Sequence, residues 1–359
     1  MTDRLPVMVT AVGGGGFGEQ ILKALRLSGL DLEIVGTDMS PVSTGLCKVE
    51  RGYVVPPASD ARYPDILLSL CRRHGVLAVF PGSEAELKVL SACRSLFADA
   101  GIVLPINPAD VIDIGLDKTR TFSFLDANGF ACPKTFVVRA EADLARVDVA
   151  PCVLKPSIGG GGSVNVMIAQ RPAEVQMLGR YLLSLYDEFI VQEYVGTPEE
   201  EYTVGVLTSM DGEFINSIAL KRNILSSLSN RVRVPNRSGN GALGRTLAIS
   251  SGISQGFIDR FPEVTAACEA IAARLGSRSA INLQCRVVGG RVYVFEINPR
   301  FSGTTSLRAM VGFNEPGVLL RKHVLHERVE PRFTFRSGYI GRGLEECLVD
   351  GSRQFEAVN

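Results

Sequence analysis

The sequence of 359 residues lacks several features that would by themselves define a function class. It has no tryptophan and only three histidines, too few for a histidine-rich metal site. Its eight cysteines are scattered and form no CxxC pair, so we expect reduced thiols rather than disulfides or a zinc site. No apolar run reaches the ~18 residues of a transmembrane helix, and the N-terminus does not resemble a signal peptide. We therefore expect a cytoplasmic protein.

The sequence also lacks an excess of charge of one sign. Its 38 lysines and arginines are balanced by 38 aspartates and glutamates. No strong field is then available to attract a polyanion, so nucleic acid and membrane are not expected as partners. Hydrophobic residues make up 46% of the chain, enough for a substantial core. We expect small molecules as partners and leave a homodimer open.

The first part of the chain alternates between strand and helix patterns. Such alternation indicates a parallel α/β sheet, and we place this N-terminal domain at residues 1–115. The predicted strands are residues 5–12, 31–40, 76–82 and 101–107, and the predicted helices are 17–28, 63–74 and 85–100.

From residue 116 the pattern becomes mixed α+β, and we place a second domain at residues 116–330. Within it we expect a lid at about 132–191 and a C-terminal lobe at about 192–330, followed by a tail, 331–359, that packs on the body. Gly289 and Gly290 indicate a tight hairpin turn between two strands. The other predictions here are a helix over 116–128, a strand–glycine–strand unit over 151–169, a helix over 171–186, strands over 188–195, 201–208 and 213–220, a polar loop over 223–245, and a helix over 254–275.

Two glycine runs suit phosphate or anion binding. Gly13, Gly15 and Gly18 lie between a strand and a helix, with Asp38 about 20 residues further on, which matches a dinucleotide fingerprint. The same turn also serves anion binding or helix–strand packing. The second run, Gly159 to Gly162, follows Lys155 and lies between two strands. A flexible loop of this kind can close over phosphates while the lysine neutralises them.

A polar cluster interrupts the apolar strands near residue 290. Glu296 and Asn298 are two residues apart on a strand and so share one face, and Gln284 lies on the partner strand. A carboxylate with amide oxygens suits Mg²⁺ that is shared with substrate phosphates. Arg300 follows at the strand end, where it can bind phosphate or carboxylate. A purely structural polar network is the alternative.

Taken together, these motifs resemble the ATP-grasp superfamily, most closely its carbamoyl-phosphate-synthase-like and carboxylate–amine ligase branch. The resemblance runs from about residue 5 to residue 330. It rests on the order of LDKTR, VLKP with its glycine loop, QEYV, EYTV and EINPR. It implies a pre-ATP-grasp α/β domain followed by a two-lobed ATP-grasp fold with a mobile lid. The length allows one such unit.

The resemblance also implies a role for each matching residue. Lys118 and Lys155 correspond to nucleotide-phosphate lysines, and Lys155 with Arg300 to catalytic residues. Glu201 corresponds to the acid that binds ribose hydroxyls, although Glu199 and Glu200 leave the register open. The implied cofactors are ATP and two Mg²⁺ (or Mn²⁺) ions. The other implied positions are the phosphate loop Gly159, Gly160, Gly161 and Gly162, the adenine hinge Glu193, Tyr194 and Val195, and the metal ligands Gln284, Glu296 and Asn298.

The implied function is an ATP-dependent ligase that activates a carboxylate as an acyl phosphate and joins it to an amine or ammonia. Three alternatives stay open: a carboxylase-type subunit acting on bicarbonate, a nicotinamide-dependent oxidoreductase, and a catalytically silent nucleotide-binding module. Substrate residues are expected between the first domain and the C-terminal strands. The candidates are Gly15, Glu84, Glu86 and Arg233.

Overall fold

Four strands of the N-terminal domain and one strand from the C-terminal end of the chain form a parallel sheet in the order β17-β3-β2-β1-β4. The computed structural model describes residues 4–14, 16–159, 163–226, 228–343 and 356–358. Buried apolar residues of β1 and β2 form the core of this domain with helices on both faces. The strands are β1 (Leu5–Val9), β2 (Leu32–Asp38), β3 (Arg51–Val54), β4 (Ala78–Phe80) and β17 (Glu356–Ala357), and the helices are α1 (Phe17–Arg26), α2 (Tyr63–His74), α3 (Glu84–Ala92) and α4 (Arg94–Ala98).

Three details of this domain differ from the sequence predictions. The expected strand over 101–107 is reduced to one parallel bridge between Ala78 and Val103. The expected helix over 85–100 is two helices, because Cys93 leaves the helical region with φ −108° and ψ 26°. Strand β3 was not predicted, because only four residues, RGYV, carry it.

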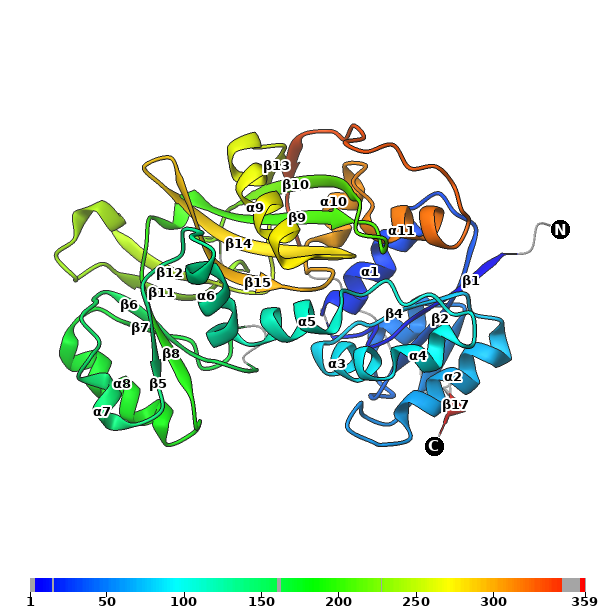
Figure 1. Cartoon of the computed structure of the whole chain (residues 1–359), viewed down its shortest axis with the longest axis horizontal. Coiled ribbons are helices and arrows are strands. Elements are labelled where there is room, and N and C mark those ends of the chain that lie inside the picture. The colour runs from blue at the N-terminus through cyan, green and yellow to red at the C-terminus, as the bar shows by residue number, and fades with distance from the viewer. Residues whose placement is uncertain (1–3, 15, 160–162, 227, 344–355, 359) are drawn as a thin grey trace.

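The second part of the chain is built on an antiparallel sheet in the order β15-β14-β9-β10-β13-β16, packed against α9. Figure 1 shows this sheet between the N-terminal domain at one end and the lid at the other. The strands are β9 (Glu201–Thr208), β10 (Phe214–Arg222), β13 (Gly256–Asp259), β14 (Ala280–Val288), β15 (Arg291–Asn298) and β16 (Gly338–Ile340), and the helices are α5 (Ala109–Leu116), α6 (Lys118–Ala127), α9 (Pro262–Leu275), α10 (Thr305–Met310) and α11 (Glu315–His323).

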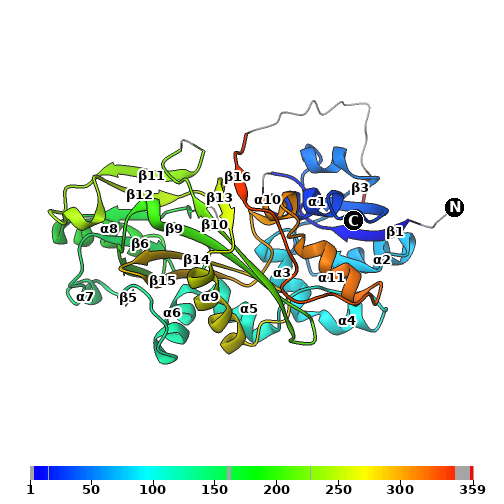
Figure 2. The ribbon, with the colours of Figure 1, turned by 90° about the horizontal axis from the view of Figure 1, so that it is seen from above.

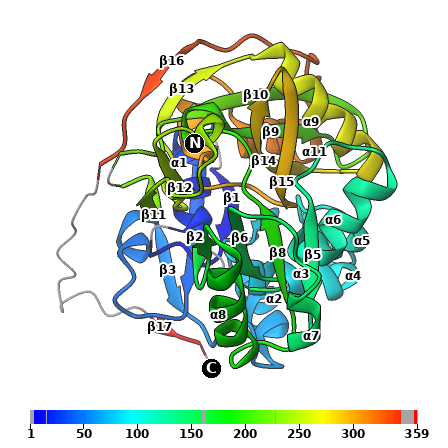
Figure 3. The same cartoon turned by 90° about the vertical axis from the view of Figure 1, so that its left-hand side faces the viewer.

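The segment predicted as the lid forms a separate antiparallel sheet in the order β5-β8-β6-β7. Its helices lie on the side away from the central sheet, as Figures 1 and 3 both show. The predicted pairing of the strands that flank the glycine run is present as β6 with β7. The elements are β5 (Thr135–Val138), α7 (Glu141–Leu144), β6 (Cys152–Pro156), β7 (Met167–Ala169), α8 (Pro172–Leu183) and β8 (Phe189–Glu193).

The segment after β10 contradicts two predictions. The expected polar loop over 223–245 contains strand β11 (Asn230–Pro235), which pairs with β12 (Thr246–Ser250). Its residues alternate between half-buried and exposed, so its apolar face is too narrow to stand out in the sequence. The expected helix over 254–275 begins only at Pro262, a favoured first helical position, and residues 256–259 form β13 instead. Figure 2 shows the β11–β12 hairpin beside the lid.

The expected helix over 116–128 is also divided. Asp117 is extended, with φ −115° and ψ 113°, and its side chain accepts a hydrogen bond from the Arg120 amide. Helix α5 therefore ends at Leu116 and α6 begins at Lys118. The cap places Lys118 at the start of a helix, facing the lid. Among the residues that the structure describes, no helix is long and apolar enough to cross a membrane.

Candidate active site

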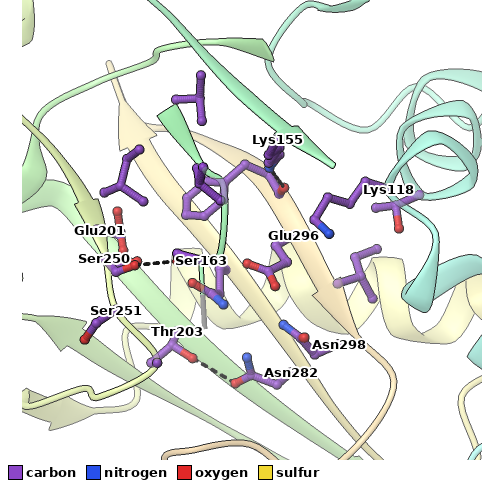
Figure 4. A pocket seen from close by; sticks show the side chains of 18 of the residues that line it. Lys118, Lys155, Ser163, Glu201, Thr203, Ser250, Ser251, Asn282, Glu296 and Asn298 are labelled. Atoms are coloured by element: carbon purple, nitrogen blue, oxygen red, sulfur yellow. Dashed lines mark hydrogen bonds between the residues drawn. The ribbon is translucent and has the colours of Figure 1, made fainter. Parts of the chain in front are cut away.

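A cavity lies where the central sheet, the lid, the β11–β12 hairpin and the N-terminal domain meet. It contains about 1420 Å³ of empty space, part of which is open to solvent. Figure 4 shows side chains from several of these elements pointing into it. Most of the predicted site residues line it: Glu84, Lys118, Lys155, Gly159, Glu193, Tyr194, Val195, Glu201, Gln284, Glu296, Asn298 and Arg300.

The inner wall of the cavity is a sheet face with polar residues at every second position. On β14 these are Asn282, Gln284 and Arg286, all of which line the cavity. Gln284 pairs with Glu296 on one neighbouring strand, and Asn282 pairs with Asn298. The predicted shared face of the amide and carboxylate side chains is therefore present.

A β-bulge on this wall supplies a hydrogen-bond acceptor for Lys155. The register of β14 with β15 shifts between Gln284 and Cys285, and Phe295 has no partner residue in the pairing. Its carbonyl oxygen accepts a hydrogen bond from Lys155 Nζ at 3.1 Å. Burial lowers the pKa of Lys155 to about 7, and the charge of Lys118 acts in the same direction, while the Glu296 carboxylate opposes both. The ammonium group is thus held in a place that penalises its charge until an anion arrives.

Lys118 approaches the same space from α6. Its Nζ donates to the carbonyl of Gly159, at the start of the glycine run, at 3.1 Å. Figure 4 shows Lys118, Glu296 and Asn298 pointing into a common space. Two lysines and a carboxylate therefore converge where the glycine loop begins. Gly160, Gly161 and Gly162 lie outside the described residues.

Two buried arginines that the sequence reasoning missed surround Glu201. Arg222 donates to Glu201 at 3.0 Å, and Arg286 donates to it at 2.9 and 3.0 Å. The side chains of Arg222 and Glu201 are each 2% exposed. We call these three residues the closed cluster. Both carboxylate oxygens of Glu201 accept hydrogen bonds from arginine, and its role in binding ribose hydroxyls stays a prediction.

The three predicted metal ligands differ in how much of their oxygen is already engaged. The Gln284 oxygen accepts a hydrogen bond from Arg222 at 3.0 Å, and the Asn298 oxygen accepts one from Arg300 at 2.9 Å. The Glu296 carboxylate accepts no hydrogen bond from any of the described residues. No group of three or more His, Cys, Asp or Glu side chains suitable for a metal occurs in the described part of the chain. The donor set is one carboxylate with amide oxygens, which suits a hard cation that also binds phosphate oxygens.

Where the N-terminal domain borders the cavity, Arg300 joins the two domains. Its Nη2 donates to Glu84 of the N-terminal domain at 2.7 Å, and its guanidinium lies 4.3 Å from the ring centre of Phe17. The side chains of Arg300 and Glu84 are 15% and 34% exposed. Burial opposes the ionisation of Glu84, but Arg300 and Lys118 outweigh it and lower the pKa of its carboxyl. We call Glu84 and Arg300 the open pair.

Two other predicted substrate residues, Glu86 and Arg233, do not line the cavity. Glu86 is buried in the N-terminal domain, where it accepts hydrogen bonds from Thr10 at 2.7 Å and Tyr63 at 2.8 Å. Arg233 is exposed on β11. Gly15 lies outside the described residues.

In the first glycine turn, the amide of Gly13 donates to Asp38, the acid that a dinucleotide ribose would need, at 3.0 Å. A Cβ on Gly18 would lie 2.2 Å from the carbonyl oxygen of Ala11. This glycine therefore allows helix α1 to pack closely on β1.

Comparisons with known families match both parts of the chain. Residues 186–342 match the model described as "ATP-grasp in the biosynthetic pathway with Ter operon", and residues 12–105 match the model "PylC-like, N-terminal domain". Residues 186–342 thus match an ATP-grasp family, residues 12–105 match the N-terminal domain of a PylC-like family, and the fold agrees with both matches.

Curated relatives include carbamoyl phosphate synthase large chains. That of Renibacterium salmoninarum is 26% identical over 297 residues, which are 78% of this chain and 24% of the relative. That of Thermoplasma acidophilum is 22% identical over 302 residues, 81% of this chain and 27% of the relative. The chain thus spans about a quarter of the length of these relatives.

Solved structures with the same fold come from several enzymes. The ADP complex of purK, N5-carboxyaminoimidazole ribonucleotide synthetase, has a TM-score of 0.66 at 16% identity and covers 94% of this chain and 82% of that one. The L-amino acid ligase from Bacillus licheniformis has a TM-score of 0.63 at 15% identity, covering 92% and 78%. The biotin carboxylase domain of Hydrogenobacter thermophilus 2-oxoglutarate carboxylase was solved with MgADP, ADP and bicarbonate. It has a TM-score of 0.63 at 14% identity, and the match covers 91% of this chain and 71% of that one. Identities this low establish the fold alone.

Proposed function

We propose that this protein is an ATP-dependent ligase that activates a carboxylate as an acyl phosphate and transfers the acyl group to an amine or ammonia. The observation that carries the proposal is the convergence of Lys118, Lys155 and Glu296 in one cavity that Arg300 also lines. Phosphoryl transfer depends on positioned positive charge, because negative charge spreads over the γ-phosphate oxygens and the leaving group. Two lysines and an arginine supply that charge here.

In this proposal the nucleotide binds with its phosphates against the lysines and its base against the hinge. Glu193, Tyr194 and Val195 line the cavity at the junction of lid and central sheet. Tyr194 is fixed there, because its hydroxyl bonds both the amide and the carbonyl of Ala248 on β12. The β11–β12 hairpin therefore holds the hinge side of the nucleotide site.

A divalent cation fits the remaining donors. Glu296, with Asn298 and Gln284 beside it, would hold Mg²⁺ together with phosphate oxygens, as its preference for oxygen ligands requires. When bound, the ion would neutralise charge on those oxygens. The amide oxygens also keep hydrogen bonds from Arg222 and Arg300, so Glu296 is the principal ligand in this proposal.

The reaction then has two balanced steps. A carboxylate oxygen attacks the γ-phosphorus, the bond from that phosphorus to the β,γ-bridging oxygen breaks, and ADP leaves. The nitrogen of a neutral amine next attacks the acyl carbon, phosphate leaves with the oxygen that joined it to the acyl group, and the nitrogen loses a proton. A closed lid would exclude water that otherwise hydrolyses the acyl phosphate.

A carboxylase-type reaction on bicarbonate is the second candidate. It is supported by the fold shared with a biotin carboxylase domain that was crystallised with MgADP and bicarbonate. In this case carboxyphosphate takes the place of the acyl phosphate, and the same lysines bind the nucleotide.

The test is ADP formation from Mg-ATP, measured with a matrix of organic acids, bicarbonate and amines. Ligase activity predicts ADP release that requires an organic acid, and hydroxylamine should trap that acid as a hydroxamate. Release that requires bicarbonate, with ¹³C-bicarbonate incorporated into product, would favour the carboxylase reaction instead. Failure of Mg-ATP to bind in calorimetry would contradict both candidates.

A further inference from the structure

The open pair brings two opposite charges with few other partners to the wall of the cavity. Arg300 Nη2 donates to Glu84 at 2.7 Å and to Asn298 at 2.9 Å, while Nη1 donates to the backbone of Phe301. Arg300 Nε is buried and has no hydrogen-bond partner among the described residues. The guanidinium therefore keeps one unused donor next to the cavity.

A simple carboxylate would disturb this arrangement. If it bound the guanidinium of Arg300, Glu84 would lose its ionic partner. Glu84 would then lie near a second carboxylate and near the phosphates of ATP. An unpaired, partly buried carboxylate next to like charge is costly. Glu84 would thus oppose the entry of an anion that carries no positive charge of its own.

A zwitterion avoids that cost because it brings both charges. Its carboxylate can take the place of Glu84 on Arg300, and its ammonium group can take the place of Arg300 on Glu84. Each charge on the protein then keeps an opposite partner. Because the bonded atoms of the open pair are 2.7 Å apart, the two charges of the ligand must also be close together, as they are in an α-amino acid.

We infer that the activated substrate is an α-amino acid, whose ammonium group is bound by Glu84 and whose carboxylate is bound by Arg300. This inference rests on the proposed function and specifies its substrate class. Arg300 also bonds Asn298, so a carboxylate held there lies beside the residues proposed to bind the cation and the γ-phosphate. The cavity lining also includes four small residues, Gly115, Ser302, Gly303 and Thr304.

The test compares α-amino acids with acids of the same carbon skeleton that lack the amino group. Mg-ATP, hydroxylamine and each of the twenty standard amino acids are supplied, and ADP and hydroxamate are measured against the deaminated acid, for example alanine against propionate. At least one amino acid should give both products, with kcat/KM about 100-fold or more above that of its deaminated partner, since a site built for a charged group rejects an analogue without it. Equal values within each pair would overturn this inference and leave the proposed function standing.

The variant Glu84→Gln tests the assigned residue, because it removes the charge and keeps a hydrogen-bond acceptor for Arg300. It should raise the KM for the amino acid at least tenfold. It should also lower the ratio of kcat/KM for the amino acid to kcat/KM for the deaminated acid. The matched control is Glu213→Gln, which removes one glutamate from an exposed ion pair of 2.8 Å with Lys322 outside the cavity and should change neither value. An unchanged preference in Glu84→Gln would overturn the assignment. ADP release with no acid of either kind would overturn the proposed function and this inference together.

Discussion

Two groups of opposite charges border the same cavity and differ in how completely they are enclosed. In the closed cluster, Glu201 and Arg222 are each 2% exposed, and Glu201 has two arginine partners. In the open pair, Glu84 is 34% exposed and one arginine is its only ionic partner among the described residues. Exchange of partners is costly where water cannot reach and inexpensive where it can. The closed cluster therefore suits a scaffold, and the open pair suits a ligand.

The largest expected effect comes from breaking the closed cluster. Glu201→Ala leaves two arginines buried without their carboxylate and should lower the free energy of unfolding by about 3–5 kcal/mol. Glu84→Ala in the open pair should change it by about 0–1 kcal/mol, because its charges are partly solvated. Urea denaturation of both variants measures the difference. Equal losses in the two variants would show that enclosure does not separate the two groups.

The second effect concerns Glu296 and Gln284, two of the residues proposed to bind the cation. Glu296→Gln should lower turnover by about 10²–10³-fold, comparable to the loss of one preorganised electrostatic contact, and leave the fold intact. Gln284→Ala should cost less, because the Gln284 oxygen is already bonded to Arg222 of the closed cluster. Steady-state kinetics at fixed Mg²⁺, with circular dichroism for the fold, give the ranking. Normal turnover of Glu296→Gln would contradict the assignment of Glu296 as a ligand of the cation.

The third effect depends on pH, through Lys155, whose pKa is influenced by Glu201 of the closed cluster. Burial, the main cause, lowers the pKa of Lys155 to about 7. Between that value and its ordinary pKa of 10.5 the folded protein binds fewer protons than the unfolded chain, so the Lys155 contribution to the free energy of unfolding rises with pH. Phosphates restore the charge, so nucleotide binding above pH 7 should take up a proton, and affinity should fall by at most about tenfold per pH unit.

Calorimetry at pH 8 in buffers of different ionisation enthalpy measures that proton uptake. Lys155→Met should abolish it, whereas Lys118→Met should retain it while weakening binding. Proton uptake that persists in Lys155→Met would assign the titration to another group.

The smallest effect concerns the lid, which borders the closed cluster through the β11–β12 hairpin. Ser163 at the end of the glycine loop donates to the carbonyl of Ser250, and Ser250 accepts a hydrogen bond from Arg222. An ATP analogue should slow hydrogen exchange over residues 155–165 severalfold, because lids of this kind close over nucleotide. Residues 63–74 of α2, far from the cavity, are the internal control. Identical exchange of residues 155–165 with and without the analogue would contradict a closing lid.

The sequence predicted those parts of the site that depend on strand alternation and local motifs. The spacing of Glu296 and Asn298, with Gln284 across the hairpin, was enough to place all three on one face. Arg286 obeys the same rule, two residues after Gln284, and could have been found with it. Arg222 could not, because it ends a strand beside a segment whose hairpin was predicted as a loop.

Contacts between domains could not be predicted from the sequence either. Glu84 and Glu86 are both acidic residues in the first turn of α3, and nothing local separates them. The structure does separate them, because Glu84 meets Arg300 across the domain boundary while Glu86 points back to Thr10 and Tyr63. The bulge that exposes the Phe295 carbonyl to Lys155 is likewise a property of strand pairing and has no local signature.

The most direct test of the acyl phosphate is the fate of oxygen from the activated carboxylate. The acid that supports ADP release is supplied with ¹⁸O in both carboxylate oxygens, and the phosphate formed with an amine acceptor is analysed by mass spectrometry. The proposed reaction predicts one ¹⁸O atom in each phosphate, because the oxygen that attacks the γ-phosphorus leaves with it. Phosphate without ¹⁸O would contradict the formation of an acyl phosphate and with it the proposed ligase reaction.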